Sequence, residues 1–121
     1  VSVARCCMVP KDILPARVNQ HVMIIRASNN LNLSYYILCT LCHSENKNKL
    51  LGISQSGSTR EAITKAEIED FDILLPSSLV LMNFDILMKN VFNQKDIQNK
   101  ENQKLGELNS LLLAKMTKVE M

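Results

Sequence analysis

The chain has 121 residues, of which 46% are hydrophobic and 21% are charged, and its formal net charge is +2 at pH 7. These values are typical of one ordinary globular domain, and the near-neutral charge excludes a polycationic nucleic-acid coat while allowing a local basic patch. No apolar run approaches the roughly 20 residues that a membrane-spanning helix needs, so we expect no membrane association.

The N-terminal region is expected to contain the main strand. Val1–Ala4 has the pattern of a short strand, and a loop is predicted between Pro10 and Pro15. Arg17–Arg26 has the clearest strand pattern, because its second half is continuously apolar, as in a strand buried on both faces. The start at Val1 lacks both an initiator Met and the order of a signal peptide. We therefore expect a processed start or a piece cut from a longer chain, in the cytoplasm.

Helical spacing follows this segment. The apolar positions of Leu33–Cys42 predict an amphipathic helix, and 44–51 either extends it or begins another turn. Gly52–Gly57 is rich in glycine and serine, which favours a strand edge entering a turn.

A capping signal comes next. Thr64 and Glu67 have the spacing of a capping box, which starts a helix. That helix is expected to be short, because apolar residues in 71–75 alternate at the strand period. Pro76 then ends the strand, and Ser77 or Ser78 can cap the next helix.

The C-terminal region is predicted to be one long helix, with Gly106 as its only breaker. At 1.5 Å per residue it would reach roughly 60 Å, which is more than the preceding globule can cover. Its second apolar stripe therefore lacks an intramolecular partner and is expected to pair with another helix, in a homodimer or in a neighbouring subunit. The residues expected to pair are Leu105, Leu108, Leu112 and Met116.

The cysteines and histidines suggest three kinds of chemistry. Cys39, Cys42 and His43 match the C-x-x-C-H pattern of haem attachment, but the motif lies on an apolar helix without an export signal. Zinc would need a second ligand pair, and Cys6 and Cys7 are adjacent. Redox catalysis would need a thioredoxin-like βαβ context. We therefore expect buried, reduced thiols, with no metal, cofactor or catalytic residue.

Two segments have side chains suited to DNA. Arg can read guanine edges, and Asn or Gln can read adenine, so Arg17, Asn19 and Gln20 are candidates, with a solvated strand end as the alternative. Gly57–Arg60 lacks the Lys-Ser/Thr ending of a nucleotide-binding loop. Its hydroxyls and Arg could still hold a DNA phosphate, with a capped turn as the alternative.

The order of these segments resembles a known family. Gly57–Thr59, followed by apolar residues up to Pro76, is similar to the end of a target-recognition domain in the DNA-specificity (S) subunit of type I restriction-modification systems. Arg17–Arg26 and the segment around Tyr36 fit the same family, and Glu101–Met116 is similar to the helix that closes such a half.

The resemblance implies an α+β fold, with a partial target-recognition domain over 1–76 and a spacer and dimerisation helix over 77–121. In that family the subunit is not an enzyme and carries no cofactor: recognition domains read a split DNA site, and long helices set the spacing and dock the partners. The implied partners are double-stranded DNA, methyltransferase subunits, the restriction subunit as a further candidate, and a second helix.

We therefore expect a DNA-specificity module. The expected DNA contacts are Arg17, Asn19, Gln20, Gly57, Ser58, Thr59, Arg60 and Lys65. The alternative is a structural protein, a fragment or remnant, that dimerises through its C-terminal helix without binding DNA.

Overall fold

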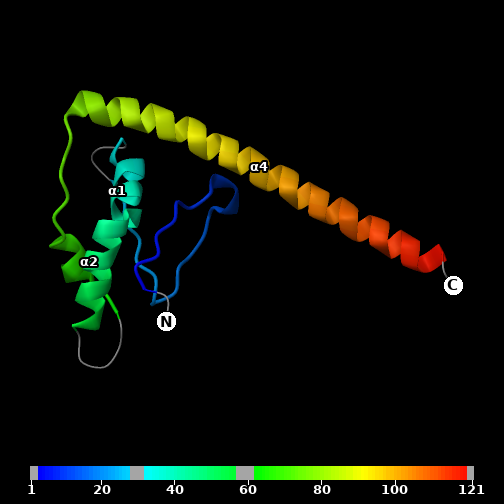
Figure 1. The fold of residues 1–121 in the computed structure, drawn as a ribbon, viewed down its shortest axis with the longest axis horizontal. Coiled ribbons are helices and arrows are strands. Elements are labelled where there is room, and N and C mark those ends of the chain that lie inside the picture. The colour runs from blue at the N-terminus through cyan, green and yellow to red at the C-terminus, as the bar shows by residue number, and fades with distance from the viewer. Residues whose placement is uncertain (1–2, 28–31, 57–61, 120–121) are drawn as a thin grey trace. The chain divides into compact units, whose positions relative to one another are not determined.

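The structure is a computed structural model that describes residues 3–27, 32–56 and 62–119. The regular elements in these ranges are all helical (Figure 1). The chain divides into two compact units, Val1–Asp85 and Ile86–Met121, and the boundary between them falls within the last helix. The elements are η1 (Lys11–Ile13), α1 (Leu33–Cys42), α2 (Ser44–Gln55), α3 (Lys65–Glu69) and α4 (Ser78–Val119).

The α+β fold class is wrong, because no strand forms among the described residues. Residues 17–26 were expected to be a buried strand, but Val22 and Ile24 are 54% and 52% exposed. The segment instead belongs to an out-and-back loop over 3–27 (Figure 1). A strand needs a hydrogen-bonded neighbour, and an apolar run alone cannot supply one.

The other predicted strands fail in the same way. The alternating residues of 71–75 lie outside any regular element, and Leu74 is 85% exposed. Residues 3 and 4 at the end of the first predicted strand are also irregular. Alternation of apolar residues is typical of a strand with one buried face and one exposed face. In this segment the face that should be buried is exposed to solvent.

The strand edge predicted at Gly52–Gly57 is also wrong as far as Ser56, because α2 continues through Gly52 to Gln55. A glycine inside a helix costs only about 1 kcal/mol relative to alanine. Leu50 and Ser54, four residues apart on one helical face, are both buried, and this packing outweighs the glycine. The Ser54 hydroxyl also donates a hydrogen bond to the Leu51 carbonyl (2.8 Å).

The helix predicted at Leu33–Cys42 is confirmed as α1, and α2 follows it after a break at His43. His43 has φ −59° and ψ 136°, an extended conformation that interrupts the helical path. The Asn46 side chain bridges the break by donating to the Thr40 carbonyl (2.9 Å). Figure 1 shows the two helices as one kinked column, and residues of α1 and α2 are in contact with one another.

The core of the first unit is small. Among the described residues the buried hydrophobic side chains are Leu41 on α1, Leu50 on α2 and Leu81 in the first turns of α4. The Tyr36 and Phe84 rings meet edge to face, with centroids 6.0 Å apart. The Tyr36 hydroxyl also donates to the Leu74 carbonyl, which ties the irregular 71–75 segment to α1.

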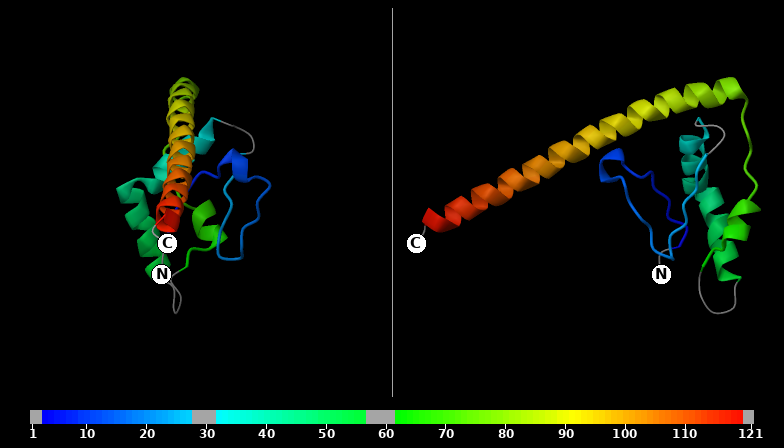
Figure 2. Two further views of the ribbon diagram at one scale, coloured as in Figure 1. Left: turned by 90° about the vertical axis from the view of Figure 1, so that its right-hand side faces the viewer. Right: turned by 180° about the vertical axis from the view of Figure 1, so that it is seen from behind.

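The long helix is confirmed. α4 spans 42 residues without interruption at Gly106, as Figure 2 shows from two further directions. At 1.5 Å per residue it is about 63 Å long. Its first hydrogen bond runs from the Leu81 amide to the carbonyl of Ser77, which precedes the helix. In the described part of the chain, no helix combines the length and apolar character needed to cross a membrane.

Candidate functional site

The predicted DNA-reading residues near the N-terminus lie on a turn. The Asn19 side-chain oxygen accepts a hydrogen bond from the His21 amide (2.9 Å), and the Asn19 carbonyl accepts one from Val22 (3.2 Å). Asn19 is thus part of the turn's own bonding. Arg17 and Gln20, on either side of it, are exposed. The structure therefore offers two of the three side chains to a ligand.

Lys65 is the remaining described DNA candidate and opens α3. Its ammonium group forms an ion pair with Glu69 one turn later (3.3 Å), and both side chains are largely exposed. Such a pair contributes little to stability and is readily exchanged for a phosphate contact. The other candidates, Gly57, Ser58, Thr59 and Arg60, lie outside the described residues.

The predicted pairing face is fully presented by α4. Leu105 and Leu108 are 63% and 62% exposed, and Leu112 and Met116 are 58% and 60% exposed. Their spacing of three or four residues keeps them on one side of the helix. The exposed side chains of Leu111 and Leu113 widen this apolar surface. Pairing stays a prediction, and the surface it needs is present.

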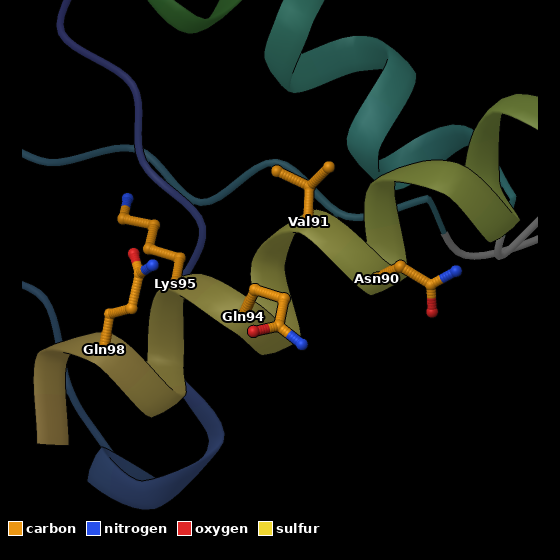
Figure 3. Close-up of a pocket in the computed structure, with 5 residues that line it drawn as sticks. All are labelled: Asn90, Val91, Gln94, Lys95 and Gln98. Atoms are coloured by element: carbon orange, nitrogen blue, oxygen red, sulfur yellow. The ribbon is translucent and has the colours of Figure 1, made fainter. Parts of the chain in front are cut away.

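A polar stretch precedes the pairing face along α4. Figure 3 shows Asn90, Val91, Gln94, Lys95 and Gln98 around a shallow hollow on this helix. The Lys95 ammonium nitrogen lies 5.5 Å from the centre of the Phe92 ring, a cation–π distance. Four of the five side chains around the hollow are polar, but the surface that lines it is formed mainly by their apolar atoms and by Val91.

Sequence reasoning missed one hollow in the first unit. It has a volume of about 460 Å³ and lies beside the contact between Tyr36 and Leu74. Its polar lining includes His43, Lys49 and Asp72, and Lys49 also pairs with Glu45 at 3.0 Å. No linear motif could have indicated it, because its residues come from α1, α2, the 72–74 segment and the start of α4.

The thiols differ from expectation. All four cysteines are free, but only Cys6 and Cys39 are half-buried, whereas Cys7 and Cys42 are exposed. Burial raises the pKa of Cys6 and of Cys39, and the neighbouring Cys42 adds to the rise in both. The expectation of buried thiols is therefore wrong for Cys7 and Cys42. In the part of the chain that the structure describes, no group of His, Cys, Asp or Glu is arranged to hold a metal ion.

Comparison of the chain with protein-family models, with curated proteins and with solved structures found no match. The candidate sites are therefore assigned from the residues of this chain alone.

Proposed function

We propose that this chain is a DNA-sequence specificity module of a type I restriction-modification enzyme, which reads part of a split DNA site and docks methyltransferase subunits through its long helix. The observation that carries this proposal is α4, a continuous helix of 42 residues with an exposed apolar face near its C-terminal end. The order of segments along the sequence supplies the link to DNA specificity.

Burying the apolar side chains of the pairing face would lower the free energy of the protein. Fully burying a Leu or Met side chain contributes about 1.5–3 kcal/mol, and the pairing face presents four such side chains to water. A second helix that carries the same face can cover them, as in a coiled coil. Pairing is the arrangement in which these exposed residues stabilise the molecule.

The polar stretch within α4 can act as a spacer. Residues 93–104 contain Ile97 as their only large apolar residue and separate the pairing face from the start of the helix. At 1.5 Å per residue, this stretch extends over about 18 Å. A polar helical stretch of this kind, placed before a pairing face, is what the proposal requires of a spacer helix.

The DNA-contact part of the proposal rests on exposed polar side chains. Arg17 and Gln20 are exposed and do not belong to a strand. Lys65 can exchange its surface ion pair for a contact with a DNA phosphate. Because the recognition part is helical and irregular here, base contacts would come from loops. Loop contacts are common in DNA recognition and become ordered on binding.

A second candidate is an interaction protein that dimerises through α4 without binding DNA. One observation favours it: Asn19 is engaged in its own turn. Both candidate functions use the pairing face, so only binding to DNA and to methyltransferase subunits distinguishes them.

The test is co-purification of the tagged chain from its native host, followed by DNA retardation at low salt. Recovery of methyltransferase subunits together with salt-sensitive DNA binding is the expected result. Failure to recover those subunits, combined with no retardation at low salt by the paired species, would refute the specificity proposal and leave the interaction protein.

A further inference from the structure

We propose that Cys6 and Cys42 are a redox-sensitive thiol pair, which closes to an intrachain disulfide in the presence of a low-molecular-weight disulfide such as oxidised glutathione. The inference is independent of the proposed DNA function. It concerns the attachment of the N-terminal segment to α1.

Geometry brings these two cysteines together from distant parts of the sequence. The Cys42 sulfur lies 3.9 Å from the Cys6 carbonyl oxygen, a contact across 36 residues. The nearby Cys42 thiol also contributes to the raised pKa of Cys6, after burial. A Cys42 sulfur this close to the Cys6 backbone can be brought to the Cys6 sulfur by side-chain rotation.

The competing pair on α1 is less favourable. Cys39 and Cys42 are three residues apart in a regular helix, where β-carbons of such pairs lie about 5–6 Å apart. A disulfide needs a β-carbon separation of roughly 3.5–4.5 Å, so closing this pair would distort the last turn of α1. Cys6 belongs to an irregular segment that can move toward its partner without such a cost.

The exposure of Cys42 determines which thiol reacts first. Cys42 is exposed, so its thiolate can attack one sulfur of oxidised glutathione, forming a mixed disulfide and releasing one glutathione thiol. The Cys6 thiolate then attacks the Cys42 sulfur and releases the second glutathione thiol. Two protein thiols are oxidised and one glutathione disulfide is reduced, and the two thiol protons are balanced by the two glutathione thiols formed.

The bond would change the folded unit in a defined way. The segment between Cys6 and η1 has no regular structure, and the disulfide would tie it to the end of α1. Cross-linking residues this far apart restricts the unfolded chain, so the oxidised form is expected to melt at a higher temperature. Reduction would reverse the shift.

The experiment uses two full-length double variants with matched chemistry. Cys7→Ser with Cys39→Ser leaves only the proposed pair, whereas Cys6→Ser with Cys42→Ser leaves the other two thiols. Each is equilibrated with glutathione redox buffers, alkylated, and analysed by non-reducing peptide mass spectrometry, with circular dichroism as the check that α-helix content is retained.

The first variant is expected to form a monomeric intrachain disulfide with an equilibrium constant at least about tenfold above that of the second. The unsubstituted chain is expected to fall from four reactive thiols to two. Equal constants for the two folded variants, or a 39–42 bond in the unsubstituted chain, would overturn the proposal. A first variant that forms only bonds between chains would do the same.

Discussion

Thr64 and Glu67 cap α3 reciprocally. The Glu67 carboxylate accepts hydrogen bonds from the Thr64 amide (2.7 Å) and hydroxyl (2.8 Å), and the Thr64 hydroxyl accepts one from the Glu67 amide (3.3 Å). This box was predicted from the sequence and is confirmed. It allows a helix of only five residues to begin at a defined position, directly after the part of the chain that holds the predicted phosphate-binding turn.

The capping box predicts a pH dependence of α3. The Thr64 amide and hydroxyl lower the pKa of Glu67 below its ordinary value of 4.5. A carboxylate with a lowered folded pKa stabilises the fold fully above the unfolded value, and that contribution is lost as the pH falls through the lowered pKa. We therefore expect α3 to lose order only below about pH 4.5, monitored by the Glu67 amide signal in NMR spectra.

Two variants serve as controls for that titration. Glu67→Gln keeps a side-chain oxygen for the Thr64 amide but has no charge, so its α3 signals should not follow the titration seen in the parent chain. Thr64→Ala removes the hydroxyl and should weaken α3 at every pH. An acid transition in Glu67→Gln identical to that of the parent chain would contradict the assignment.

Leu50 should be the most sensitive position of the small core. It is 1% exposed, so Leu50→Ala is expected to destabilise the first unit by about 2–5 kcal/mol through lost burial and a new cavity. The matched substitution Leu74→Ala removes the same atoms from a side chain that is 85% exposed and should change stability by less than about 0.5 kcal/mol. Urea unfolding followed by circular dichroism measures both. Equal losses would show that the core is misplaced.

Tyr36 should stabilise the first unit through its hydroxyl as well as its ring. Tyr36→Phe keeps the edge-to-face contact with Phe84 and removes the hydrogen bond to the Leu74 carbonyl. The expected loss is about 0.5–1.5 kcal/mol of unfolding free energy. Phe84→Leu removes the ring contact but keeps the hydrogen bond, so the two substitutions separate the contributions in a urea titration. No loss in Tyr36→Phe would show that the hydroxyl contact is unimportant in solution.

Arg17 should matter for DNA if the specificity proposal holds. Arg17→Ala is expected to weaken binding about tenfold or more. If the contact is to a phosphate, the slope of log K against log salt should also fall by about one. Lys118→Ala removes the same charge near the other end of the chain and should leave affinity nearly unchanged. Fluorescence anisotropy over a salt series measures both, and equal effects would contradict a local contact at Arg17.

The sequence predicted α1, α3 and α4 but not the full extent of α2, and it predicted strands that do not form, for one physical reason. Helix signals such as the Thr64–Glu67 box and the spacing of Leu33–Cys42 depend on residues three or four apart, so local sequence contains them. The strand predicted over 17–26 depended on a partner elsewhere in the chain, which an apolar pattern cannot specify. The strand edge predicted at Gly52 was wrong for a related reason, because burial of its neighbours Leu50 and Ser54 decides the conformation of this glycine.

The candidate sites also differ in whether they depend on local sequence or on contacts between distant segments. The pairing face of α4 could be predicted because it repeats along one helix, and its exposure agrees with the expectation that it lacks an intramolecular partner. The proximity of Cys6 to Cys42 and the hollow beside Tyr36 could not be predicted, because each joins segments more than thirty residues apart.

The most direct test of the pairing helix, on which the proposed function depends, is sedimentation equilibrium of the full chain and two variants. Leu108→Lys with Leu112→Lys places two charges on the pairing face. Ala114→Lys places a charge nine residues from Leu105, two and a half turns away at about 3.6 residues per turn, and therefore on the opposite side of α4. We predict that the parent chain and Ala114→Lys self-associate, whereas the double variant sediments as a monomer with unchanged helix content. Self-association of the double variant equal to that of the parent, or a monomeric parent chain that also captures no helical partner, would contradict the account.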